Sequence, residues 1–204
     1  MIKPLSDAVK SPVIVTFSGT RYTPFNPKKV DVSIIDIAHS LSQQCRYAGH
    51  CDFFYSVAEH SVHVSHMVPD QFALEALLHD GAEAYCHDMM YPVKNNLPDY
   101  LKLIAKNERV VRRAFGLPRR ESAYVRFADT MIGRYERLMI TKHWVHSPPL
   151  RAAALRSLKS GWLAYVERIH NGRLTANGLY FPTLGCHDPV RAKEEFLRRF
   201  NELT

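Results

Sequence analysis

The chain has 204 residues, of which 46% are hydrophobic and 23% are charged, and this composition is typical of one soluble globular domain. There is no apolar run long enough to span a bilayer, and the N-terminus lacks the apolar stretch of a secretion signal, so we expect a cytoplasmic protein. The formal net charge of +7 favours anionic partners such as nucleotides, phosphate esters or nucleic acid, without choosing among them. None of the four cysteines forms a C-x-x-C pair, so we expect reduced thiols, with histidine and carboxylate as the metal ligands.

The first predicted element is a small β-hairpin. Val13 to Ser18 is rich in β-prone residues, Gly19-Thr20 is a turn signal, and Arg21 to Thr23 resumes an extended pattern. After two prolines the pattern becomes helical, with apolar residues from Ile34 to Leu41 on one face and Ser33 as the N-cap. A loop rich in aromatic and polar residues is expected from 45 to 55.

Two helices with candidate functional residues are predicted after this loop. Ser56-Val57-Ala58-Glu59 matches the S-x-x-E capping box, so a helix is predicted to begin there and to end near Pro69, with Glu59 acting in the box. The next helix is predicted from about Asp70 to Tyr85. Further helices are expected over residues 100–115, closed by Gly116, from 121 or 122 to 143, from 150 to 169 and from 190 to 200.

Together these elements predict an all-α fold, a compact helical bundle preceded by the short N-terminal β-hairpin. The sequence has no internal repeat, no low-complexity segment and no linker, so residues 1–204 are expected to form one domain. Within it, residues 1–30 are expected to form the hairpin and an extended segment, residues 31–145 the catalytic helical core, and residues 146–204 the C-terminal helices.

A His-Asp dipeptide occurs three times, and its context separates the three copies. His187-Asp188 precedes a proline in a stretch rich in glycine and proline, which is typical of a turn or a helix cap. His87-Asp88 lies just beyond a predicted helix, where histidine can satisfy terminal carbonyls. His79-Asp80 instead follows an apolar run in the predicted helix 70–85, where a buried carboxylate is costly unless it is paired or bound to a metal.

Other ionisable residues could complete a metal site around this third copy. Glu83 lies three residues after Asp80, on the same face of the predicted helix. His60 on the preceding helix and Asp129 in a later apolar helix would add an imidazole and a carboxylate, which makes a four-ligand N/O site. Two alternatives stay open: an ordinary buried His–Asp pair without metal, and His63 as a ligand in place of His60.

The strings around these residues resemble those of HD-domain phosphohydrolases. The resemblance is strongest to the branch that acts on 2′-deoxynucleotides, which includes bacterial 5′-deoxynucleotidases and phage dATP triphosphohydrolases. It covers residues from about Phe17 to Ile140, and the C-terminal third is not informative. The matching strings are Tyr55 to Ser61, Leu77 to Tyr85, Asp88 with Pro92-Val93-Lys94, and Ala128-Asp129.

The resemblance implies an α-helical bundle whose inner helices carry the metal ligands, which here would be His60, His79, Asp80 and Asp129. It implies that Glu83 and Asp88 take part in catalysis. It also implies that Arg46 lies against the phosphate and Tyr47 against the sugar. Lys94 could neutralise further phosphate charge, and the alternative for it is a solvated loop lysine.

We therefore predict a metal-dependent phosphohydrolase that converts 2′-deoxynucleotides to deoxynucleoside and phosphate. Within this class, the favoured prediction is a dATP triphosphohydrolase of the phage type. The expected cofactor is a divalent transition metal, one of Co, Zn, Mn, Fe or Ni, with magnesium as an additional ion on the substrate phosphates. The expected partners are the small-molecule substrate and further copies of the chain in a dimer or hexamer, with no membrane and no nucleic acid; for a phage-encoded chain the compartment is the host cytoplasm. The alternatives are an HD phosphodiesterase for a cyclic or alarmone nucleotide, and a non-enzymatic basic helical module that binds nucleic acid.

Overall fold

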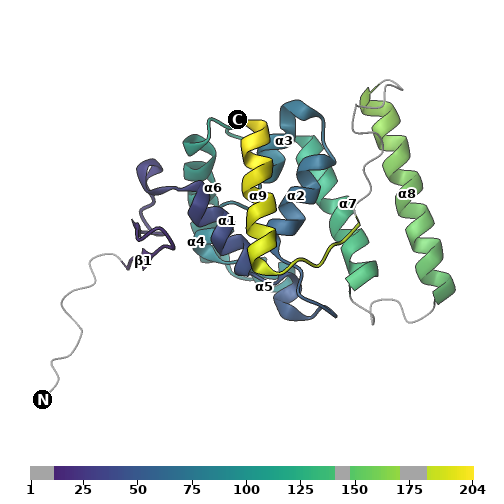
Figure 1. Ribbon diagram of the computed structural model, residues 1–204, viewed down its shortest axis with the longest axis horizontal. Coiled ribbons are helices and arrows are strands. Elements are labelled where there is room, and N and C mark those ends of the chain that lie inside the picture. The colour runs from purple at the N-terminus through teal and green to yellow at the C-terminus, as the bar shows by residue number, and fades with distance from the viewer. Residues whose placement is uncertain (1–11, 141–147, 171–182) are drawn as a thin grey trace, which may run out of the picture.

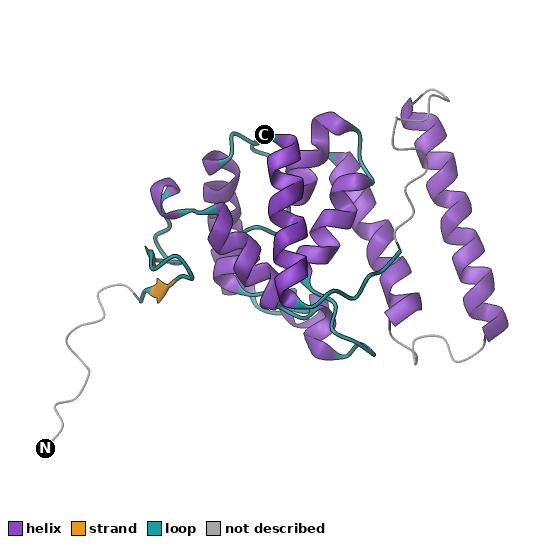
Figure 2. Cartoon of the chain, in the orientation of Figure 1, coloured by secondary structure: helices purple, strands orange, loops and turns teal. Residues whose placement is uncertain are grey.

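The computed structural model describes residues 12–140, 148–170 and 183–204, and these residues are mainly helical (Figures 1 and 2). Two short strands, β1 (Ile14–Val15) and β2 (Arg21–Tyr22), pair antiparallel ahead of the first helix. The helices in chain order are α1 (Ile34–Gln43), α2 (Val57–His66), α3 (Asp70–Leu77), α4 (Glu83–Cys86), α5 (Tyr91–Lys94), α6 (Pro98–Ala114), α7 (Ala123–Ile140), α8 (Pro148–His170) and α9 (Pro189–Leu203), with 3₁₀ turns at Lys29–Asp31 and Arg46–Gly49. Within the described residues, no helix has both the length and the apolar character needed to cross a membrane.

The predicted hairpin and most of the predicted helices are confirmed. Helix α1 begins directly after Ser33, and α2 begins after Ser56, whose hydroxyl accepts the N–H of Glu59 at 3.0 Å. Gly116 follows the end of α6 with a φ of 68°, the left-handed conformation that glycine adopts without strain at a helix end. Parts of three predictions lie outside the described residues: the first part of segment 1–30, the end of the helix to 143, and most of the loop 171–189.

The segment predicted as one helix from 70 to 85 is two helices, so the prediction was wrong on this point. Helices α3 and α4 are separated by a turn over residues 78–82, in which Gly81 donates its N–H to Leu78 O at 3.0 Å. A Cβ on Gly81 would lie 3.0 Å from that same carbonyl and 3.1 Å from a methyl carbon of Val111 on α6. Glycine therefore lets this turn, which carries the predicted His-Asp ligand pair, pack closely against α6.

Helix α2 is a central element of the described fold. It packs against α1, α3, α7 and α9, and all its residues from Val57 to Ser65 are buried. One apolar cluster joins it to β2, α1, α6 and α9, and a second joins it to α7 and α8. Because a helix that is buried on all sides is held firmly by its neighbours, a polar side chain on α2 has a fixed position away from bulk water.

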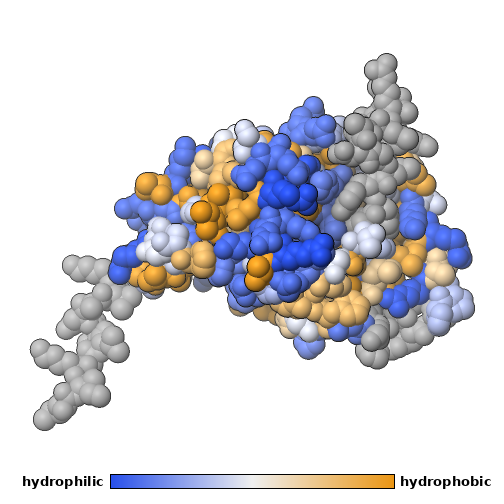
Figure 3. All heavy atoms as spheres, viewed as in Figure 1, coloured by the Kyte–Doolittle hydropathy of each residue, from blue (hydrophilic) through white to orange (hydrophobic). Residues whose placement is uncertain are grey.

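Helix α9 lies across α1 and α2 in the view of Figure 1. Its Ala192 and Phe196 are fully buried, whereas most of its charged residues are exposed or half-buried and form part of the blue region near the centre of Figure 3. Asp188 caps the helix, because its carboxylate accepts the N–H groups of Val190 and Arg191 at 2.9 and 3.1 Å. The cap confirms the prediction of turn or cap chemistry for this His-Asp copy.

Candidate metal centre

The four side chains predicted as metal ligands come together from three parts of the fold. His60 lies on α2, Asp129 on α7, and His79 and Asp80 in the turn after α3. One ligand atom from each of His60, His79 and Asp129 lies within 4.8 Å of the other two. Asp80 lies beside this group, with its Oδ2 3.1 Å from Nε2 of His79 and 3.8 Å from Nε2 of His60. Two imidazoles and two carboxylates therefore meet at one point.

The two imidazoles present their Nε2 atoms to this point, and both atoms are buried without a hydrogen bond. The nearest carboxylate oxygens lie 3.2 Å from His60 Nε2, in Asp129, and 3.1 Å from His79 Nε2, in Asp80. These contacts are close, but they do not have hydrogen-bond geometry. Since buried polar atoms rarely remain unpaired, a cation shared by these nitrogen and oxygen atoms fits this set of donors.

The site is closed on its histidine side and open on its aspartate side. The side chains of His60 and His79 are 0% and 5% exposed, whereas those of Asp80 and Asp129 are 20% and 44% exposed. A metal ion that takes part in a reaction needs an open position for water or substrate. The Asp129 side can supply such a position.

Each imidazole is oriented by a contact at its other nitrogen. His79 Nδ1 lies 2.7 Å from Ala76 O, which is one of the last carbonyls of α3. Because a carbonyl can only accept, Nδ1 carries the hydrogen, and Nε2 of neutral His79 presents its lone pair to the site. His60 Nδ1 lies 2.7 Å from Oε1 of Glu136, which orients this second ring in the same way.

Glu136 on α7 was not among the predicted site residues. It is fully buried and lies seven residues after Asp129, which places both on one face of the helix; this spacing is the signal in the sequence that could have identified it. Its carboxylate contacts four side chains: His60 Nδ1 (2.7 Å), the Tyr55 hydroxyl (2.8 Å), the Tyr47 hydroxyl (2.9 Å) and Arg46 Nε (3.2 Å). One carboxylate thus orients a predicted metal ligand and two of the three predicted substrate-binding residues, Arg46 and Tyr47.

The pKa values of these groups are shifted in the directions that favour positive charge at the site. Burial alone would lower the pKa of His79, but the adjacent Asp80 raises it to about 10. Burial alone would raise the pKa of Asp80, but His79, His60 and Arg46 hold it well below its usual range. The pKa of Glu136 is also lowered in spite of burial, because Arg46 and His60 lie against it. Carboxylates that favour a proton on a buried imidazole also favour a divalent cation at the same place.

Glu83 and Asp88, the predicted catalytic residues, lie in the same electrostatic field. Glu83 was predicted to share a helix face with the His-Asp pair. This prediction was wrong, because Glu83 begins α4 after the turn. It is buried, and its Oε1 lies 3.2 Å from Nζ of Lys94. Burial, together with the charges of Asp80 and Asp88, raises the pKa of Glu83 well above its usual range. Burial raises the pKa of Asp88 too, and carboxyl groups shifted toward neutral pH are better suited to give and take protons.

The loop that carries Arg46 and Tyr47 has an unusual backbone. Tyr47 and Ala48 have φ angles of 56° and 50°, and Gly49 follows with 78°. The left-handed region costs a non-glycine residue roughly 1–2 kcal/mol. The hydrogen bonds of Arg46 and Tyr47 to Glu136 offset part of this cost and hold the loop in its conformation.

This loop places Arg46 at the edge of the candidate metal centre. One terminal guanidinium nitrogen of Arg46 lies 3.8 Å from Oδ2 of Asp80. The hydroxyl of Tyr47 lies 2.9 Å from Oε2 of Glu136 and 3.2 Å from Gly133 O, and these two acceptors share its single hydrogen, so its ring is fixed between the loop and α7. Both residues therefore lie next to the predicted ligands.

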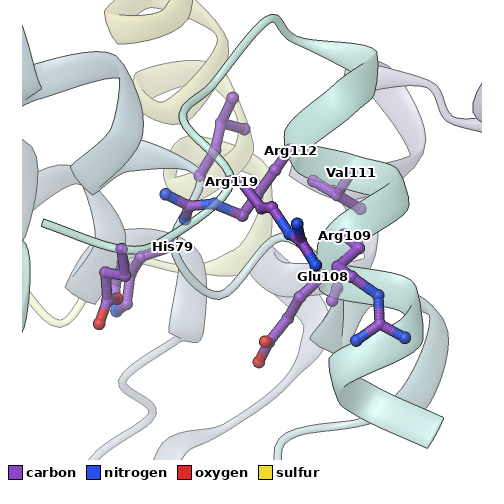
Figure 4. A pocket seen from close by; sticks show the side chains of 9 residues that line it. His79, Glu108, Arg109, Val111, Arg112 and Arg119 are labelled. Atoms are coloured by element: carbon purple, nitrogen blue, oxygen red, sulfur yellow. The ribbon is translucent and has the colours of Figure 1, made fainter.

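A small cavity lies beside His79, between the turn, α6 and the loop that follows α6. In Figure 4 His79 stands on one side and Glu108, Arg109 and Arg119 on the other. Its volume is about 140 Å³, well below the roughly 300 Å³ at which pockets begin to hold small ligands. A ligand as large as a nucleotide does not fit in this cavity.

His63, the alternative ligand, belongs to a different contact. Its Nε2 lies 3.6 Å from Oε1 of Glu59. Glu59 was predicted to complete the capping box, but its carboxylate instead accepts three backbone N–H groups at 2.8–2.9 Å, those of Gly185, Cys186 and His187. Two successive residues of α2 therefore have different roles: Glu59 binds the backbone of the C-terminal segment, and His60 faces the candidate metal centre.

Replacing Glu136 by glutamine is expected to lower metal affinity by about 10- to 100-fold, the usual effect of losing a partner that orients a metal-binding histidine. Glutamine keeps the shape of the side chain but loses the charge that orients His60 and pairs with Arg46. The buried guanidinium would then lack its partner, which also lowers stability. Metal affinity can be measured by titration calorimetry, and stability by thermal unfolding.

The matched control is Glu75→Gln. Glu75 is also a buried glutamate that pairs with a buried arginine, Arg112, but its other contact is the N–H of Ser122. This variant should unfold at a lower temperature while its metal affinity stays that of the wild type. Equal metal affinity in the Glu136 and Glu75 variants would contradict the role assigned to Glu136.

No protein-family model matches the sequence. The chain is similar to the uncharacterized protein YfdR of Escherichia coli strain K12, with 48% identity over 124 residues, which are 61% of this chain and 70% of YfdR. It is also similar to an uncharacterized protein of Rhodobacter capsulatus, with 35% identity over 133 residues, which are 58% of this chain and 68% of that protein. Neither name states an activity.

Proposed function

This chain belongs to the family of the Escherichia coli protein YfdR, and we propose that it is a metal-dependent phosphohydrolase of the HD-domain type. The proposed reaction converts a 2′-deoxynucleotide to deoxynucleoside and phosphate, and its narrower form is a dATP triphosphohydrolase of the phage type. One observation carries the proposal: the Nε2 atoms of His60 and His79 are buried without hydrogen bonds and lie against the carboxylates of Asp80 and Asp129.

The proposed cofactor is one divalent transition metal, Co, Zn, Mn, Fe or Ni, because the donors are imidazole and carboxylate without thiolate. When bound, such an ion polarises a phosphate oxygen and lowers the pKa of water toward neutrality. The residues that would hold it are His60, His79, Asp80 and Asp129. Magnesium is proposed as an additional ion on the substrate phosphates.

Arg46 and Lys94 are proposed to bind the phosphate. Glu136 accepts a hydrogen bond from Nε of Arg46, and one terminal guanidinium nitrogen lies 3.8 Å from Asp80. The terminal N–H groups are proposed to donate to an anion at the edge of the centre. Lys94, whose ammonium group is held by Glu83, brings a second positive charge within electrostatic range of Asp80. Tyr47 is proposed to lie against the deoxyribose, since its ring is fixed beside Arg46.

Glu83 and Asp88 are proposed to handle the protons of the reaction. Attack on phosphorus in line with the leaving oxygen needs one group to orient the water and another to protonate the leaving group. The raised pKa values of both carboxyl groups support these roles. We further propose that the protein acts in the cytoplasm, that of the host for a phage-encoded chain, as a dimer or hexamer.

The proposal is tested by metal analysis of the purified protein followed by substrate profiling. The panel contains deoxynucleoside mono- and triphosphates, ribonucleotides, a cyclic nucleotide and an alarmone, with products separated by chromatography. We expect bound divalent metal, and phosphate release from deoxynucleotides that stops on chelation and returns when metal is added back. Cleavage of only the cyclic nucleotide or the alarmone would replace the proposal with the phosphodiesterase alternative, and a metal-free protein that binds nucleic acid would replace it with the non-enzymatic one.

A further inference from the structure

Two thiols face each other across the loop that carries Arg46. Sγ of Cys45 and Sγ of Cys51 lie 3.5 Å apart, and both cysteines are free and partly exposed. The Cys51 thiol also donates a hydrogen bond to Arg46 O at 3.6 Å. Since a disulfide bond is about 2.05 Å long, the two sulfurs have to approach by about 1.5 Å to form one.

The backbone holds both cysteines in this arrangement. Cys45 pairs with Ser56 in an antiparallel bridge at the start of α2. Asp52, which directly follows Cys51, donates its N–H to Ile140 O at 2.9 Å. Because the chain is anchored at both ends of the loop, the fold itself sets the short distance between the thiols, and side-chain rotation supplies the remaining movement.

We propose that Cys45 and Cys51 form a reversible disulfide bond that clamps the loop of residues 46–50. The oxidant is a low-molecular-weight disulfide. The loop that the bond would close contains left-handed Tyr47 and Ala48, and non-covalent contacts with Glu136 now hold it. A covalent link between its ends restricts its alternatives to this conformation. The inference goes beyond the proposed function, since it requires neither metal nor nucleotide.

The chemistry balances in two exchange steps. The Cys45 thiolate attacks the small disulfide, forms a mixed disulfide and releases one small thiol. The Cys51 thiol loses its proton to water and attacks the Cys45 sulfur, which releases the second small thiol. The protein pair thus loses two electrons and two protons, and the oxidant gains them. Burial, with the adjacent Cys45 thiol, raises the pKa of the Cys51 thiol to about 12, which favours its acting second.

The test treats the full-length protein with oxidised glutathione, alkylates the remaining thiols and measures the intact mass. Wild type is expected to lose two of its four free thiols and to regain them on reduction. Cys45→Ser and Cys51→Ser should form no internal disulfide, and Cys45→Ala serves as a second variant if the serine variant folds poorly. Cys86→Ser is the matched control, because it leaves the pair intact and should still lose two thiols.

Hydrogen–deuterium exchange then measures whether the disulfide bond restricts the loop of residues 46–50. Oxidation should slow amide exchange over residues 46–50 in wild type and in Cys86→Ser, but not in Cys45→Ser. Cys186 is the competing thiol, since it lies close enough to contribute to the pKa of Cys51. Four unreacted thiols in oxidised wild type, a bond that Cys186→Ser abolishes, or unchanged exchange over the loop would each overturn the proposal.

Discussion

Replacing Asp80 by alanine is expected to remove bound metal and, with it, phosphate release. The variant loses one of four ligands, and it also loses the carboxylate 3.1 Å from His79 Nε2 that makes the centre favourable for positive charge. The drop in metal affinity should exceed the roughly 100-fold that follows from losing only a partner of a ligand. Metal content per chain by mass spectrometry and activity on the best deoxynucleotide measure the two effects.

Asp99→Ala is the control for this change. Asp99 is an aspartate of α6 whose side chain is 98% exposed and pairs only at the surface with Lys102. Its loss should leave metal content and turnover as in the wild type, because exposed ion pairs contribute little. Wild-type metal content in the Asp80 variant would show that the centre has been assigned wrongly.

Replacing Glu83 by glutamine is expected to give the opposite combination, with metal retained and turnover reduced by about 10²- to 10⁴-fold, the usual contribution of a positioned acid or base. Glutamine preserves the size of the side chain but cannot exchange a proton. It also removes the charge that holds Lys94 at 3.2 Å, so the Michaelis constant for the nucleotide is a separate readout of Lys94. Steady-state kinetics and metal analysis separate the two effects.

The control for Glu83 is Glu108→Gln. Glu108 is an exposed glutamate of α6 that lines the small cavity beside His79. Its replacement should change neither metal content nor turnover, since it contacts none of the proposed ligands or catalytic residues in any described ion pair. Full turnover in the Glu83 variant would leave Asp88 as the remaining candidate for proton transfer.

Local chemistry made much of the fold predictable. The turn at Gly19, the capping serine Ser56, the terminal Gly116 and the capping Asp188 each act within a few residues of their own position. The break after α3 was not predictable in this way. It depends on Gly81 packing against α6, a contact between segments that are distant in sequence, and the apolar run before it is compatible with an unbroken helix.

The residues of the candidate site also divide into those that local sequence could predict and those that depend on distant contacts. The four ligands could be proposed because ionisable residues in apolar helices are costly without a partner. The structure brings these four together, although their binding of metal stays a prediction. Glu136 was missed because its importance lies in contacts with residues up to 90 positions away, such as Arg46. The actual partners of Glu59 were missed for the same reason, since they lie 126 to 128 residues further along the chain.

The hydrogen bonds from Gly185, Cys186 and His187 to Glu59 connect the C-terminal segment to the residue that directly precedes the proposed metal ligand His60. The boundary expected near residue 145 between a catalytic core and accessory helices is therefore not a place where the protein can be cut. A shortened version ending near residue 145 would leave that carboxylate inside the protein without its three backbone N–H donors, one residue before His60. The final segment is thus as much a part of the scaffold of the candidate metal centre as the helices that surround it.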